Sequence, residues 1–134
     1  MILNIENSIN QRLKENISAY LVESFPANIR DYLVNFTHPK GSVLINYAGS
    51  KFSEADNPNS NAQTRTLEFD IYVVQRNLKS NRGVYPLLEL VKTSLTGFEP
   101  EGCMRMYPVS DDFVLEEKGI WVYVMKFNTL APTV

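Results

Sequence analysis

The stretch TLEFDIYVVQR, residues 66–76, decides the fold class, because its side chains alternate in character along the chain. Successive side chains on a β-strand point to opposite faces, so alternate residues share one face. The apolar series is Leu67, Phe69, Ile71 and Val73. The series between them is Glu68, Asp70 and Tyr72. The pattern predicts a strand with one face in the core and the other face in water.

An amphipathic helix is predicted on each side of this strand, over residues 2–18 and 84–96. Apolar residues recur every three or four positions in both segments, which places them on one helical face. The two stripes are Ile2, Ile5, Ile9, Leu13 and Ile17, and then Val84, Leu87, Leu88, Val91 and Leu95. Pro86 suits the first turn of the second helix, and Gly97 suits the position after its end.

The other segments are predicted to be mainly strands and turns. Residues 29–36 alternate and favour a strand, whereas residues 19–25 fit a short strand or a helix extension that stops at Pro26. Further strands are predicted over residues 43–48, 104–109, 113–116 and 120–127, and turns over residues 37–41, 77–83 and 117–119. Pro108 marks an edge strand or a bulge. This order predicts a single α+β domain over residues 1–134, a mostly antiparallel sheet with two amphipathic helices packed on one face.

The final strand, residues 120–127, is apolar on both of its faces. One series is Ile120, Val122 and Val124, and the other is Trp121, Tyr123, Met125 and Phe127. With helices on one face of the sheet, one series needs cover from a loop, a curled sheet or a neighbouring subunit. Because exposed patches of large apolar side chains usually mark interfaces, Trp121, Tyr123, Met125 and Phe127 are candidate interface residues.

A long loop is predicted over residues 49–63, which are rich in Ser, Asn, Asp and Pro. Loops of this length usually carry a function or are disordered. We therefore expect this segment to be exposed and to contact a partner. The candidate residues in and beside it are Phe52, Glu54, Asp56 and Arg65.

Composition excludes several classes of function. The 134-residue chain has a net charge of −2 and no run of Lys or Arg, which argues against sequence-specific nucleic-acid binding and against a membrane-surface patch. Its single cysteine, Cys103, cannot form an internal disulfide. The first residues lack the pattern of a signal peptide, so a cytosolic protein is expected.

No catalytic or metal-binding constellation is evident, so the sequence predicts neither an enzyme nor a cofactor. His38 is the only histidine and precedes Pro39 in a turn, without the spacing of a metal or catalytic motif. Cys103 fits a small buried apolar residue better than a nucleophile. The six glycines do not form a phosphate-binding loop.

Several segments form a recognisable series along the chain. They are Phe25-Pro26, HPKGSVL at 38–44, YAGS at 47–50, QTR at 63–65, GVYPLL at 83–88, LTGF at 95–98, Gly102-Cys103 and GIWVY at 119–123. In order and spacing, this series resembles the small tail proteins of Mu-like phages and prophages. That family is similar in fold to phage tail-terminator proteins, in which a sheet and two helices build a ring subunit.

The resemblance implies a structural subunit at the head-proximal end of a tail tube. Its partners would be copies of itself, in a ring of six, together with tail-tube and head-connector proteins. It would reside in the cytoplasm of the host bacterium before assembly and in the virion tail afterwards. Two alternatives stay open: a small monomeric protein-binding module that uses residues 49–63, and an enzyme that uses His38 or Cys103.

Overall fold

The computed structural model describes residues 1–36, 40–54, 63–79 and 83–133. In chain order, its elements are α1 (Ile2–Asn16), β1 (Leu21–Ser24), α2 (Ile29–Val34), β2 (Ser42–Phe52), β3 (Gln63–Gln75), α3 (Val84–Leu95), β4 (Tyr107–Glu117) and β5 (Ile120–Thr133). The five strands form one sheet in the order β1-β2-β3-β5-β4. Among the strand pairs of the described residues, only β1–β2 is parallel, so the predicted α+β class with a mostly antiparallel sheet is confirmed.

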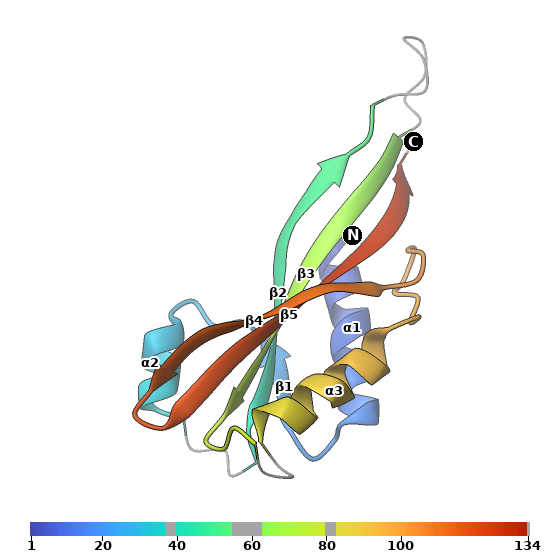
Figure 1. The fold of residues 1–134 in the computed structure, drawn as a ribbon. Coiled ribbons are helices and arrows are strands. Elements are labelled where there is room, and N and C mark those ends of the chain that lie inside the picture. The colour runs from blue at the N-terminus through green and yellow to red at the C-terminus, as the bar shows by residue number, and fades with distance from the viewer. Residues whose placement is uncertain (37–39, 55–62, 80–82, 134) are drawn as a thin grey trace.

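Helices α1 and α3 cover one face of the sheet, as Figure 1 shows. The buried residues of α1 are Ile5, Ile9 and Leu13, and those of α3 include Val84, Leu87, Val91 and Leu95. They pack on the apolar series of β3 in the main core. Gly97 follows α3 with a φ of 83°, a left-handed conformation that suits glycine. Both predicted helices and the glycine after the second are therefore confirmed.

A third helix, α2, covers part of the opposite face of the sheet (Figure 1). Asn28 caps it, because its Oδ1 accepts hydrogen bonds from the backbone N–H groups of Arg30 and Asp31 at 3.0 and 3.2 Å. The strand predicted for residues 29–36 is thus wrong. Leu33 of α2 and Phe36 just after it are spaced for one side of a helix, and they pack on β2, β3 and β5.

The two-sided character of β5 is satisfied largely within one subunit. Ile120 and Val122 lie under α2 in the second core. Met125 and Phe127 are buried in the main core, at 2% and 0% exposure. The cover expected from a loop, a curled sheet or a neighbouring subunit comes instead from α2, a helix of the same chain that was not predicted from the sequence.

Strands β2 and β3 are longer than predicted. Strand β2 continues through Gly49 to Phe52 with a register shift between Tyr47 and Gly49, and β3 begins at Gln63. The loop predicted from residue 49 is therefore wrong for residues 49–52, and residues 55–62 lie outside the described part. Figure 1 shows β2, β3 and β5 continuing past α2 and α3 as a three-stranded ribbon.

Strand β4 forms an edge of the sheet and is continuous, so the prediction of two separate strands is wrong. Its register against β5 shifts twice, between Pro108 and Ser110 and between Phe113 and Leu115. Pro108 therefore lies at a bulge of an edge strand, as predicted. The turn to β5 has positive φ at Lys118 and Gly119, as in a two-residue hairpin, so the predicted turn at residues 117–119 is confirmed. The turns predicted at 37–41 and 77–83 lie partly outside the described residues.

Candidate assembly surfaces

Four aromatic rings gather where β4, β5 and the start of α3 meet. The ring of Phe113 lies 5.5 Å from that of Tyr123 and 6.2 Å from that of Trp121, and the Tyr85 ring lies 6.1 Å from that of Tyr123. All three contacts are edge-on, the geometry that aromatic pairs prefer. Phe113 is 53% exposed and Tyr85 is 42% exposed. We call Tyr85, Phe113, Trp121 and Tyr123 the aromatic patch.

Acidic side chains border the aromatic patch. Asp111 lies opposite Met125 in the β4–β5 register, two positions along β5 from Tyr123, so it shares the face of the patch. Desolvation raises the pKa of Tyr123, and the neighbouring Tyr85 and Asp111 raise it further. Glu116 lies opposite Trp121 on the same face, whereas Asp112 and Glu117 lie on the other face of the sheet, and β4 has no Lys or Arg. The patch is therefore an apolar surface with a negative border.

The end of the ribbon carries a fixed arginine, Arg65. Its guanidinium lies 5.1 Å from the centre of the Phe52 ring. Its Nε donates to Ser50 Oγ at 2.9 Å and its Nη2 donates to Tyr47 Oη at 3.2 Å, while the hydroxyls of Tyr47 and Ser50 are hydrogen-bonded to each other. Phe52 remains 55% exposed. We call Phe52 and Arg65 the ribbon tip.

The structure brings together only part of the residue set predicted for the partner-contacting loop. Phe52 and Arg65 lie side by side across the β2–β3 ladder. Glu54 is exposed just beyond β2. Asp56 lies outside the described residues.

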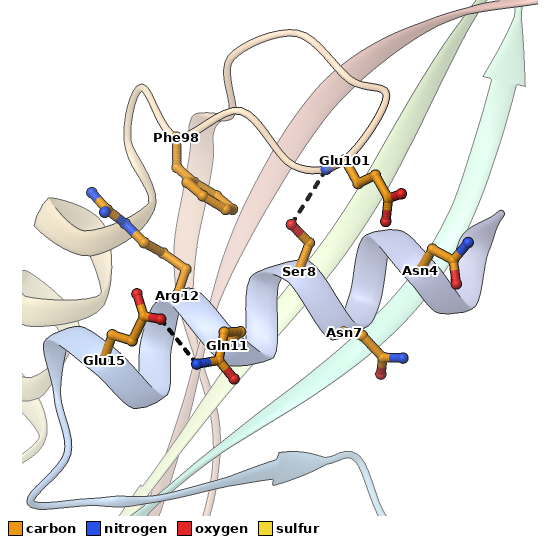
Figure 2. Close-up of a pocket in the computed structure, with 8 residues that line it drawn as sticks. All are labelled: Asn4, Asn7, Ser8, Gln11, Arg12, Glu15, Phe98 and Glu101. Carbon is orange, nitrogen blue, oxygen red and sulfur yellow. Dashed lines mark hydrogen bonds between the residues drawn. The ribbon is translucent and has the colours of Figure 1, made fainter.

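A groove of about 450 Å³ runs between α1 and the segment after α3, and Figure 2 shows its lining. Arg12 stacks on Phe98 with its guanidinium 5.2 Å from the ring centre, and its Nε donates to the Ser94 carbonyl at 2.9 Å. The backbone N–H of Glu101 donates to Ser8 Oγ at 3.3 Å. The lining is mainly amides, hydroxyls and charged ends, without a histidine or cysteine, so it offers polar contacts rather than a nucleophile.

The residues considered for catalysis do not form a site in the described part of the chain. Cys103 is half-buried against the main core. Burial raises the pKa of its thiol, against smaller lowering effects of Thr129 and Arg65. The thiol therefore stays protonated at neutral pH, which makes it a poor nucleophile. His38 lies outside the described residues, and among those described no three potential metal ligands of the His, Cys, Asp and Glu types gather.

Comparison with known proteins places the chain in a protein family. The model of the family described as "Gp37 protein" matches residues 9–134, nearly the whole chain. The chain belongs to the Gp37 family. No curated protein matches this Gp37-family chain.

The solved structures that share the fold of this Gp37-family protein include a virion component. It is a chain of the "Virion of native gene transfer agent (GTA) particle", with a TM-score of 0.67 and 10% sequence identity. The likeness covers 98% of this chain and 97% of that chain. At this identity the likeness establishes a shared fold. Within the described part of the Gp37-family chain, no helix combines the length and apolar character needed to cross a membrane.

The sequence pointed to half of the aromatic patch in this Gp37-family protein. Trp121 and Tyr123 belong to it, whereas Met125 and Phe127 are core residues. Tyr85 and Phe113 were missed. Their signals were present, because Tyr85 lies off the apolar stripe of its helix and Phe113 is an aromatic residue in an acidic strand.

Proposed function

We propose that this protein is a structural subunit of a phage or prophage tail, a tail-terminator-like ring protein that acts at the head-proximal end of the tail tube. The main support for the proposal is the fold that this protein shares with a chain of a gene transfer agent virion. The likeness covers 98% of the protein described here. Membership of the Gp37 family and the resemblance of its segments to phage tail proteins support the same role.

The surfaces of the subunit suit assembly with copies of itself. The aromatic patch exposes large rings at the edge of the sheet, and such rings often carry much of the energy of an interface. The proposed assembly is a ring of six that also contacts tail-tube and head-connector proteins. The subunit would be free in the cytoplasm of the host bacterium before assembly and part of the virion tail afterwards.

Two alternative functions have weaker support. A monomeric binding module would use residues 49–63, of which Phe52 is exposed beside Arg65. An enzyme would need Cys103 or His38 as a reactive group, and the protonated state of the Cys103 thiol argues against the first of these. We therefore propose a role without catalysis.

Light scattering after size exclusion tests the ring, with the protein alone and mixed with tail-tube protein of the same phage or prophage. A species with the mass of six subunits, free or bound to tube protein, is the expected result. Electron microscopy of that species is expected to show rings at one end of the tubes. A protein that stays monomeric under both conditions and does not bind tubes would overturn the proposal and favour the binding module.

A further inference from the structure

The ribbon tip and the aromatic patch are complementary surfaces within one chain. We propose that the ribbon tip of one subunit lies against the aromatic patch and Asp111 of the next subunit. This inference rests on the proposed function and names the contact through which the ring forms. The occupant of the patch is thus a second copy of this chain, and each copy gives one surface and receives the other.

The ribbon tip is fixed before any partner arrives. Two of the five N–H donors of Arg65 bind Ser50 and Tyr47, and the Phe52 ring supports one face of the guanidinium. Less side-chain freedom is therefore lost when a partner binds, which favours association. Other donors of Arg65 and the exposed Phe52 ring offer a charged and an apolar contact side by side.

The aromatic patch with Asp111 is opposite in charge to the ribbon tip and, like the tip, exposes an apolar ring. Asp111 lies on the face of β4 that carries Phe113, so a carboxylate stands beside an exposed ring. An arginine prefers a carboxylate or an aromatic face as its partner, and the patch presents both. Glu54 lies near the ribbon tip, and its negative charge weakens the attraction between the tip and Asp111.

The two surfaces cannot meet within one subunit. Arg65 lies opposite Ala131 of β5, and Phe113 lies opposite Tyr123 of the same strand. Ala131 and Tyr123 are therefore about 26 Å apart at the usual rise of a strand. Both surfaces lie on the same sheet face, so the sheet would have to fold back on itself to join them. The complementarity can be satisfied only between copies.

The edges of the sheet favour contact through side chains over addition of a strand. The edge strand β4 has Pro108, two register shifts and a row of acidic residues, all of which hinder pairing with another strand. The other edge, β1, has only four residues. A contact between two different surfaces is head-to-tail, and it closes into a ring when the rotation between subunits allows it.

Charge reversal tests the proposed contact. Arg65→Glu and Asp111→Arg are each expected to weaken ring formation by about tenfold or more, because each brings like charges together. The matched controls are Lys51→Glu and Asp112→Arg, which reverse charges beside these residues on the opposite face of the sheet. The controls are expected to assemble like the wild type. An equimolar mixture of the Arg65→Glu and Asp111→Arg proteins should recover rings, because alternating copies restore opposite charges at every contact.

A covalent trap tests the same contact without a charge change. In a Cys103→Ser background, Phe52→Cys with Phe113→Cys should give a ladder of linked subunits on oxidation. Phe52→Cys with Val34→Cys on α2 should not. The contact would be overturned if the wild type formed rings, charge reversal had no effect on them and no ladder appeared. The proposed ring itself would still stand. Failure of the wild type to form rings, alone or on tubes, would instead overturn the proposed function and this contact with it.

Discussion

The ring of Phe113 on β4 stands 5.5 Å from the ring of Tyr123 on β5, with 72° between their planes. Tyr123 is half-buried and packs on the main core, whereas Phe113 is 53% exposed. A charge at position 113 therefore disturbs the surface of the patch more than the core beneath it. This difference separates assembly from folding in the mutations below.

Phe113→Glu is expected to abolish the ring and to leave a folded monomer. The glutamate would place a charge in the centre of the proposed interface, beside Asp111. Light scattering reports the mass, and circular dichroism reports the fold. Val34→Glu is the control, because Val34 is 79% exposed on α2, away from the patch. A ring that tolerates Phe113→Glu would contradict the interface.

Phe127→Ala is expected to lower the free energy of unfolding by about 3–5 kcal/mol, because it opens a cavity in the main core. Phe127 is fully buried and packs among the residues that α1 and α3 cover. Urea denaturation of the monomer measures the change. Phe52→Ala, which truncates an exposed ring, is expected to change the same free energy by less than about 0.5 kcal/mol. Equal effects would show that residue 127 is not in the core.

Asp70→Asn is expected to stabilise the protein at neutral pH by about 1 kcal/mol. Asp70 is 8% exposed, and its Oδ1 has no hydrogen-bond partner in the described part of the chain. Desolvation raises its pKa above the ordinary value, Glu68 raises it further, and Lys126 lowers it. Between the ordinary and the raised pKa, the folded state holds a proton that the unfolded chain has released. The stability of the wild type therefore falls as pH rises through that window.

This prediction is checked by measuring how the difference in free energy of unfolding between the wild type and Asp70→Asn depends on pH. Urea denaturation at neutral pH and at about pH 3, below the ordinary aspartate pKa, compares the wild type with Asp70→Asn. The advantage of the variant should shrink toward zero at the lower pH, where Asp70 is protonated in both states. An advantage that is the same at both pH values would show that the charge of Asp70 does not cause it.

Asn28→Ala is expected to cost about 1 kcal/mol of stability, because the first turn of α2 loses its side-chain cap. Asn28→Gly is expected to lower stability by only a few tenths of a kcal/mol, since glycine is also a common residue at the start of a helix. Thermal or urea denaturation of both variants measures the difference. If Asn28→Ala is as stable as the wild type, the hydrogen bonds that Asn28 accepts from the N–H groups of Arg30 and Asp31 do not stabilise the helix.

The sequence predicted the elements that have a long, regular apolar pattern. Helices α1 and α3 and strand β3 each bury one continuous apolar series, and all three were found. Helix α2 was missed because it has only six residues, and in so short a segment helical and strand spacing both fit the sequence. Asn28 was the available clue, since asparagine is a preferred residue at the start of a helix.

The surfaces were harder to predict than the core. The start of the predicted loop looked irregular because Gly49, Ser50 and Lys51 are small or polar, yet the backbone continues as a strand to Phe52, and its neighbour β3 supplies the pairing. The aromatic patch joins residues from α3, β4 and β5 that are distant in sequence. Such a cluster depends on the register of the sheet, which no local pattern reveals.

The place of β5 in the sheet also bears on the order in which the molecule folds. It follows every other element in the chain, yet it pairs with β3 from Trp121 to Thr133 and separates β3 from β4. Pairings between distant segments form slowly, because a long loop must close first. Both the patch and the strand beside Arg65 are completed only when β5 docks. A chain in which β5 has not yet docked therefore lacks the aromatic patch, and under the proposed contact it could not receive the ribbon tip of another copy.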